Sequence, residues 1–584
     1  MVKNPVTGGV NDNSYTLVLN GVSSDLVRHD SDDGIGLPNP HYHPADEQFW
    51  AVWQANVGLG THYQNGAPMQ DTAWYVRTKD GTLYQFGSST PGDFASRAWW
   101  AFDRGSVGSP VGCGNYIETN RWYLSQVTDV HGNTIDYSYA WVGGYLDYYA
   151  CGGSSQGYTM GDVWPVTVTW GSAGNLRFRA IFESSARTDD LQYEKAEAQL
   201  GYGLHDTRRL DAVRVESQVG ANWELVRRYG FSYDYSLRPD SGTAFPRLTL
   251  LSAQTCAPID PGNPGQLVCL PATTFSYRMS GAPYTYGKYR LETVNNGYGG
   301  VVTYAYETFN MVQLGYYNRV VQRTVQDGLG HSFSWSYTYE NAADNHQMNS
   351  VGIWYALHIL GDSEHLVHPA HGEFRGHRKV VETDPNGNQS EHWFYQGDGY
   401  QEDGSNCTIS SYNDACYQLV EDREPQKGKE WKTVRSSGGN MYRVTYQGST
   451  VEHLPFSTPL SFGLRRNFLC PAGVTELSLE ANWSSWREKK TTTVCDPALQ
   501  GGGQYGNVTT IQEWENGAVY RTTRRSYYPN TSSWIVGLPA AEEVREQGSG
   551  AIVSLGWNSY DNGASYKVPP SKGDLTLVQG LRYD

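Results

Sequence analysis

The chain has 584 residues, of which 39% are hydrophobic and only 18% charged, and it contains 65 glycines, 43 tyrosines and 19 tryptophans. A net charge of −16 without a basic stripe excludes a nucleic-acid-binding protein, and no run of about 18 apolar residues is present to span a membrane. Because Tyr, Trp, Thr and Val favour strands while Gly and Asn favour tight turns, the composition predicts a nearly all-β protein, built as several units or as one repetitive array.

Residues 1–97 are predicted to form an N-terminal β region with few repeats. The opening MVKNPVTGGVNDNSY lacks an apolar run and a small-residue cleavage site, so it does not resemble a signal peptide. We expect either that a signal was removed or that the numbering begins inside a longer chain.

One acidic stretch of this region has a partial calcium-loop pattern. In HDSDDGIG, Asp30 and Asp32 fit the pattern, but Gly34 stands where the third ligand belongs. The stretch is therefore better explained as an acidic turn.

A second polar stretch, HYHPADE, contains two histidines and two carboxylates. In an extended segment His41 and His43 would share one face, as two metal ligands need, with Asp46 and Glu47 close behind. The more ordinary interpretation is a turn-rich surface loop, and we predict no metal site.

Residues 98–290 are predicted to be a β-rich region with disulfide-stapled loops. Segments 212–217 and 223–235 flank the turn VGAN, as expected for a hairpin. The best helical candidate, Asp189 to Leu200, is short enough to be a surface element on an inserted loop.

Cysteine usage indicates the compartment. The cysteines form four neighbouring pairs without any Cys-x-x-Cys motif, so we expect local disulfides in an oxidising, extracellular setting. The alternative is a cytosolic protein with buried free thiols. The eight predicted disulfide cysteines are Cys113, Cys151, Cys256, Cys269, Cys407, Cys416, Cys470 and Cys495.

Residues 291–584 contain, from Asn296 to Glu307, the phrase NGYGGVVTYAYE, in which a glycine turn precedes aromatic residues at alternate positions. Glycine or asparagine supplies the positive φ of a tight turn, and the alternation lays large rings on one face of a strand. Variants of the phrase are KDGTLYQFG, HGNTIDYSYAW, GLGHSFSWSYTYE, DPNGNQSEHWFYQGD and YGNVTTIQEWENG.

A single hairpin of this kind is too small to be stable alone, but hairpins stacked edge to edge share one sheet. The predicted fold is therefore all-β, with antiparallel hairpin repeats that form a long spiralling sheet with inserted loops and little helix. We expect 291–584 to be an irregular repeat region with an insertion at 397–427, continuing beyond residue 584.

These phrases, together with Tyr560-Asp561 and the final Tyr583-Asp584, resemble the rearrangement-hotspot (Rhs) or YD-repeat family. The stretches WYVRTKDGTLYQFG and RWYLSQVTDVHGNTIDYSY are similar to the region before the repeats in large secreted bacterial members. GEFRGHRKVVETDPNGNQSEHWFYQGD resembles toxin-complex B-component-like chains.

The resemblance implies a β-sheet ribbon wound into a hollow shell, which encloses a C-terminal toxin in bacterial members and serves adhesion in animal teneurins. It predicts a secreted or cell-surface structural protein, a wall segment joined to a larger polypeptide and its cargo. An alternative is a surface adhesin or filament subunit that binds carbohydrate or other copies, and a weaker one is a secreted carbohydrate-active enzyme.

No motif predicts catalysis, since neither a Gly-x-Ser-x-Gly elbow nor a phosphate loop occurs, and we expect no enzyme activity and no cofactor. In HLVHPAHGEFRGHR, the residues Pro369 and Gly372 prevent a helical ligand face, so polar loop histidines are favoured over a metal site. The histidines and the acidic residue of this stretch are His365, His368, His371, His377 and Glu373.

Exposed aromatic residues could stack on sugar rings, although packing on a sheet face is the ordinary role of such residues. The candidates are Trp99, Trp100, Trp483 and Trp486.

Overall fold

A computed structural model of the chain contains strands and turns and no α-helix in the part that it describes, which confirms the predicted all-β class. The expected helix Asp189 to Leu200 and most of the expected insertion 397–427 lie outside that part. The structure describes residues 1–3, 15–29, 40–64, 67–90, 95–102, 116–148, 156–172, 174–187, 208–235, 248–259, 265–278, 290–311, 315–344, 374–396, 426–454, 466–479, 485–496, 505–547 and 550–582.

The described strands belong to one continuous antiparallel sheet. Its first ten strands are ordered β8-β9-β1-β2-β3-β4-β5-β6-β7-β10, so that the first strand of the chain lies inside the sheet. From β10 to β33 the strands follow chain order, except that β17 and β18 both pair with β16.

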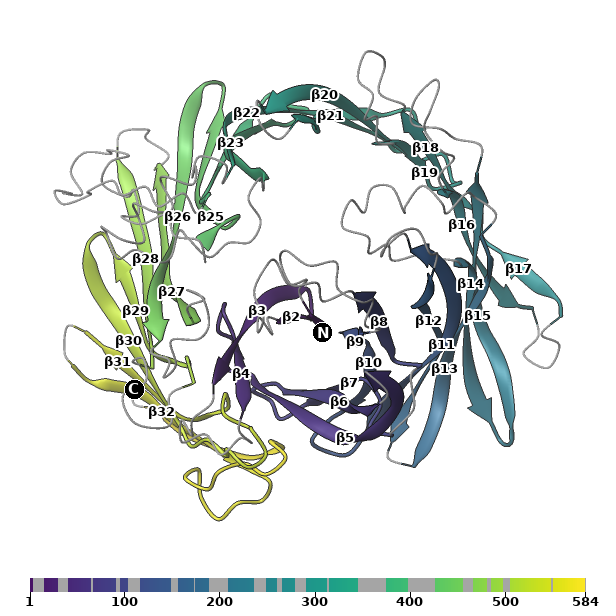
Figure 1. The fold of residues 1–584 in the computed structure, drawn as a ribbon. Coiled ribbons are helices and arrows are strands. Elements are labelled where there is room, and N and C mark those ends of the chain that lie inside the picture. Colours follow the sequence, from purple (N-terminus) through teal and green to yellow (C-terminus); the bar gives the residue numbers. More distant parts are fainter. Residues whose placement is uncertain are drawn as a thin grey trace, which may run out of the picture.

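The sheet winds as a spiral, as the sequence predicted (Figure 1). Strands β1 to β10, drawn in purple and blue, form an inner turn around the N-terminus, and β11 to β33 form an outer turn around it. The right-handed twist of neighbouring strands accumulates along such a sheet and makes it coil. The last strands of the outer turn return to the side of β4.

The inner-turn strands are β1 (Val2–Lys3), β2 (Tyr15–Leu19), β3 (Val22–His29), β4 (His41–Pro44), β5 (Ala51–Gln64), β6 (Ala67–Arg77), β7 (Leu83–Phe86), β8 (Arg97–Phe102), β9 (Tyr116–Trp122) and β10 (Leu124–Thr128). The first half of the outer turn comprises β11 (Thr134–Tyr148), β12 (Gln156–Ser172), β13 (Asn175–Ala186), β14 (Arg208–Val219), β15 (Asn222–Asp234), β16 (Thr249–Pro258), β17 (Leu267–Cys269), β18 (Thr273–Arg278), β19 (Arg290–Asn295), β20 (Val301–Met311) and β21 (Gly315–Gln326).

The second half comprises β22 (Ser332–Asp344), β23 (Phe374–Thr383), β24 (Gln389–Phe394), β25 (Glu430–Ser437), β26 (Asn440–Leu454), β27 (Arg466–Leu479), β28 (Trp486–Cys495), β29 (Val508–Glu515), β30 (Ala518–Tyr527), β31 (Pro539–Glu546), β32 (Ile552–Tyr560) and β33 (Leu575–Arg582).

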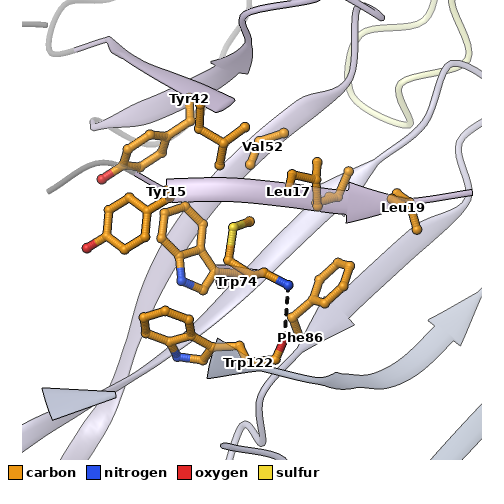
Figure 2. Packing of buried hydrophobic residues seen from close by; sticks show 11 residues of the cluster. Tyr15, Leu17, Leu19, Tyr42, Val52, Trp74, Phe86 and Trp122 are labelled. Carbon is orange, nitrogen blue, oxygen red and sulfur yellow. Dashed lines mark hydrogen bonds between the residues drawn. The ribbon is translucent and has the colours of Figure 1, made fainter. Parts of the chain in front are cut away.

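An aromatic core fills the inner turn (Figure 2). The ring of Trp74, which is fully buried, lies 4.6 Å from that of Tyr15 and 4.8 Å from that of Tyr42, both in inclined orientations. Leu17 and Trp122 pack in the same cluster. Because aromatic residues bury large apolar areas, this core holds the first strands of the chain together.

The recurring sequence phrase corresponds to a recurring turn. The carboxylate of Asp129 accepts hydrogen bonds of 2.8 Å from the backbone N–H groups of His131 and Asn133, and Gly132 between them has a φ of 81°. This arrangement satisfies the turn's backbone donors while glycine takes the left-handed conformation without strain. The same pattern recurs at Asn296, Asp327 and Asp384.

The tyrosines of the phrase connect neighbouring strands. The hydroxyl of Tyr306, for example, donates to the carbonyl oxygen of Leu291 over 2.7 Å. Each such bond joins a ring on one strand to the backbone of an earlier strand, so the tyrosine fixes how successive hairpins stack. The equivalent bonds run from Tyr139 to Leu124, Tyr233 to Leu210, Tyr277 to Leu250, Tyr339 to Val320, Tyr527 to Val508 and Tyr560 to Pro539.

The dipeptide Tyr560-Asp561 combines both roles. The Tyr560 hydroxyl donates to the carbonyl oxygen of Pro539 over 2.8 Å. The Asp561 carboxylate accepts backbone N–H bonds from Ser571, Lys572, Gly573 and Asp574, and these bonds hold its pKa at about 2 against the opposing effect of burial. The tyrosine thus binds the preceding strand, and the aspartate closes the following loop.

Candidate functional site

The end of the outer turn packs against the inner turn through a second apolar cluster. Phe49 of the inner turn contacts Phe468 of β27, with ring centroids 5.0 Å apart, and Trp534 lies beside Tyr505. We call this contact the seam. Its buried residues are Phe49, Ala51, Phe468, Cys470, Cys495, Tyr505, Trp534 and Val536.

Backbone and side-chain hydrogen bonds cross the seam. The indole nitrogen of Trp534 donates to the Phe49 carbonyl over 3.0 Å, and the backbone N–H of Val536 donates to the Lys79 carbonyl over 3.0 Å. Asp80 and Ile535 form an isolated antiparallel bridge at the same place. The seam therefore joins the two turns by β-type pairing as well as by apolar contact.

Lys79 is a charged residue of the inner turn that takes part in the seam. Its ammonium donates to the carbonyl of Tyr505 over 2.6 Å and lies 5.6 Å from the centroid of the Phe49 ring. Burial lowers the pKa of Lys79 to about 8, against the opposing effect of Asp496 and Glu47. The seam thus contains a partly desolvated cation that binds a carbonyl, lies over an aromatic ring and is attracted by two carboxylates.

The seam also requires glycine. Gly81 has a φ of 85°, and a methyl group at its Cα would lie 2.6 Å from a methyl carbon of Val130 and 2.9 Å from the carbonyl oxygen of Ser533. The turn at Gly81 can therefore approach both the β10–β11 turn and the outer turn only without a side chain.

A cluster of three buried histidines, absent from the sequence-based prediction as a group, lies next to the seam. His29 on β3 pairs directly with His41 on β4, and His43 follows on the same face. The ring centroids are 5.2 Å apart for His29 and His41, 5.3 Å for His41 and His43, and 5.7 Å for His29 and His43. Each histidine is at most 5% exposed. We call these three residues the histidine cluster.

The prediction that HYHPADE forms a turn-rich surface loop is wrong. The first four residues of this segment, His41–Pro44, form the buried strand β4, which pairs with β3 along one edge and with β5 along the other. His41 and His43 do share a face, as predicted, and Glu47 lies 3.3 Å from Nδ1 of His43, measured to a carboxylate oxygen. In the described part of the chain, no group of three His, Cys, Asp or Glu side chains is arranged to hold a metal ion. The register of the β3–β4 pair was the signal that could have revealed His29.

The other sequence candidates are dispersed. His377 lies on β23 among Phe309, Tyr339 and Phe374, and burial together with Arg319 lowers its pKa to about 4. His365, His368, His371 and Glu373 lie outside the described residues, as do Asp30, Asp32 and Trp483. Trp99 and Trp100 belong to β8, and Trp486 packs against an apolar cluster of the outer turn.

Two of the disulfides expected from neighbouring cysteines are present. Cys256 is bonded to Cys269 between β16 and β17, and Cys470 is bonded to Cys495 inside the seam. The remaining cysteines, Cys113, Cys151, Cys407 and Cys416, lie outside the described residues.

No protein-family model and no curated protein sequence matches the chain. Solved structures do match over nearly its whole length. The crystal structure of TcdB2-TccC3-Cdc42 is 9% identical over 97% of this chain and 46% of that chain, with a TM-score of 0.51. The Tc holotoxin pore of Photorhabdus luminescens is 9% identical over 98% of this chain and 45% of that chain, with a TM-score of 0.54.

At this level of identity the likeness concerns the fold. The chain shares the fold of the TcdB2-TccC3 toxin-complex chains, in line with its resemblance to YD-repeat proteins. It spans less than half the length of those chains. Within the described residues, no helix is long and apolar enough to cross a lipid bilayer.

Proposed function

We propose that this chain is an extracellular structural protein whose sheet forms a wall segment of a β-shell around a C-terminal, toxin-like cargo. The observation that carries the proposal is the seam, which closes the outer turn onto the inner turn across more than 400 residues of sequence. A wall that must exclude water and protease needs such a contact, since an open spiral would leave a gap along its length. We propose no catalytic role for the chain itself.

Two further observations support an extracellular container. The disulfide Cys470–Cys495 lies within the seam, and disulfides persist mainly in oxidising compartments. Polar turns and tyrosine bonds recur around the sheet, which suits a wall whose stability must be distributed along its whole circumference.

The proposal also assigns this chain to a larger assembly. The toxin-complex chains that share its fold are more than twice as long as the part that it matches. The last strand, β33, pairs only with β32 among the described strands and exposes four apolar side chains, Leu575, Leu577, Val578 and Leu581. A further antiparallel strand would pair with its open edge, and further wall would cover its apolar surface.

The same edge supports a second candidate function. An exposed strand with apolar side chains is a template for pairing with another copy, so the chain could be a filament or adhesin subunit at the cell surface. No described feature favours carbohydrate as the ligand over self-association.

Electron cryo-microscopy of the protein from its native source distinguishes the two. A closed hollow particle with density inside is the expected result. Copies joined edge to edge through β33, without an enclosed space, would reject the container and support the filament.

A further inference from the structure

A single carboxylate, that of Glu47, links the histidine cluster to Phe49 of the seam. One oxygen of Glu47 lies 3.3 Å from Nδ1 of His43, and the other accepts a hydrogen bond from the backbone N–H of Phe49. Glu47 is 2% exposed, so both interactions are shielded from water.

Phe49 depends on that hydrogen bond for its conformation. It is a non-glycine residue with a φ of 55°, a region that large side chains rarely occupy. In this conformation its ring packs on Phe468 and its carbonyl accepts the indole N–H of Trp534. Both contacts of the seam at Phe49 therefore rely on the carboxylate that His43 also contacts.

The charged groups around the cluster come from several elements. Glu47 faces His43, and Asp25 lies further along the same side of β3, where it accepts a hydrogen bond from Thr16. Lys79, which belongs to the inner turn like Glu47, attracts that carboxylate, and Lys429, directly before β25 of the outer turn, attracts Asp46. On β5 the residue paired with His41 is the uncharged Trp53.

Imidazole gains a proton in the mildly acidic range, where other side chains rarely change charge. A first proton on the cluster is favoured by the negative charge of Glu47, whose carboxylate oxygen lies 3.3 Å from Nδ1 of His43. Further protons would place like charges on rings whose centroids are 5.2 to 5.7 Å apart in a buried site, which is costly. The cost falls when the surrounding structure opens to water.

We propose that the histidine cluster is a proton-controlled latch, which keeps the seam closed at neutral pH and releases the outer turn from the inner turn at mildly acidic pH. Further protons place like charges on rings 5.2 to 5.7 Å apart, and their repulsion displaces His43 and the Glu47 carboxylate beside it from the Phe49 N–H. Phe49 then loses the bond that holds its φ, and its contacts with Phe468 and Trp534 open. That the opening serves to release a cargo rests on the proposed function, whereas the opening itself does not.

Hydrogen exchange read by mass spectrometry on the intact protein tests the latch, at about pH 7.5 and about pH 5.5 and corrected for the intrinsic effect of pH on exchange. Segments 45–53 and 530–537 should lose protection by about tenfold or more at the lower pH, while 301–326, which lies away from the seam, keeps it. Equal changes in all three segments, or no change, would overturn the proposal.

A double variant, His29→Gln with His43→Gln, should lose most of the acid response of the seam segments. His377→Gln is the matched control, because His377 is a half-buried histidine far from the seam and its pKa of about 4 keeps it neutral at both pH values. If the double variant does not fold, the wild-type comparison still decides. Release of the seam by EDTA at neutral pH would show that a metal rather than protons controls the cluster, and would also overturn the latch.

Discussion

Trp534 donates its indole N–H to the backbone carbonyl of Phe49 over 3.0 Å, although the two residues are 485 positions apart in the chain. Both have positive φ angles, 57° for Trp534 and 55° for Phe49, and both are buried. Two unfavourable backbone conformations therefore meet at the contact that closes the spiral. Such conformations persist only where the surrounding structure holds them, and here the Glu47 carboxylate and the seam do so.

The variant Trp534→Phe should weaken the seam selectively. It keeps most of the apolar contact but leaves the buried Phe49 carbonyl without its donor, which costs about 1–3 kcal/mol. Urea unfolding should show a lower midpoint with an unchanged slope. The control is Trp557→Phe, since Trp557 lies on β32 beside Tyr566 and outside the seam cluster. Equal effects of the two substitutions would argue against a special role for the Trp534 bond.

Substitution of two glycines, one inside the seam and one outside it, distinguishes the effect of seam packing on stability from the effect of backbone strain. Gly81 and Gly21 have φ values of 85° and 79°, but only at Gly81 would a methyl group meet other atoms within 3 Å. Backbone strain should lower the free energy of unfolding by about 1 kcal/mol in both Gly81→Ala and Gly21→Ala. In Gly81→Ala, steric displacement of the seam should lower it by at least about 1 kcal/mol more. Comparison of the two thermal midpoints measures the difference. If the midpoints coincide, the turn at Gly81 is free to move away from Val130 and Ser533.

The tyrosine bonds give a prediction for the repeat itself. Tyr306→Phe removes the hydroxyl that donates to Leu291 and should reduce the free energy of unfolding by about 1 kcal/mol. Tyr304→Phe, two residues away on the same strand, is the control, because no bond from its hydroxyl to a strand carbonyl is among the described contacts. Chemical denaturation of both variants checks the expectation, and a Tyr306→Phe variant as stable as the Tyr304→Phe variant would contradict it.

The spiral could be predicted from the sequence because its determinants are local. Asp129 and Gly132 build their turn within five residues, and Tyr306 contacts a strand only 15 residues earlier. The seam could not be predicted in this way, since the meeting of Phe49 with Trp534 depends on the summed twist of all the strands between them. The histidine cluster could be predicted only in part. His41 and His43 were recognised as sharing a face, but His29 joins them only through the register of β3 against β4.

The lowered pKa of Lys79 predicts a change in the free energy of unfolding within a defined pH range. Its pKa is about 8 in the folded protein, against 10.5 for an exposed lysine. Between these values the unfolded chain binds a proton that the folded chain does not, so the free energy of unfolding attributable to this group rises with pH from about 8 to about 10.5. Below about pH 8 both states carry the charge, and the folded state keeps the full cost of burying it.

The variant Lys79→Met should abolish this rise. The difference in unfolding free energy between wild type and variant should shift in favour of the wild type by up to about 3 kcal/mol across the window. Urea unfolding at a series of pH values measures it. Lys379 offers a control of opposite sign, because Glu391 and Glu340 raise its pKa in spite of burial, and its contribution to stability is instead lost as the pH rises above 10.5. A wild-type protein and a Lys79→Met variant with parallel pH profiles would mean that the Lys79 ammonium stays hydrated, and that the seam is wetter than its packing indicates.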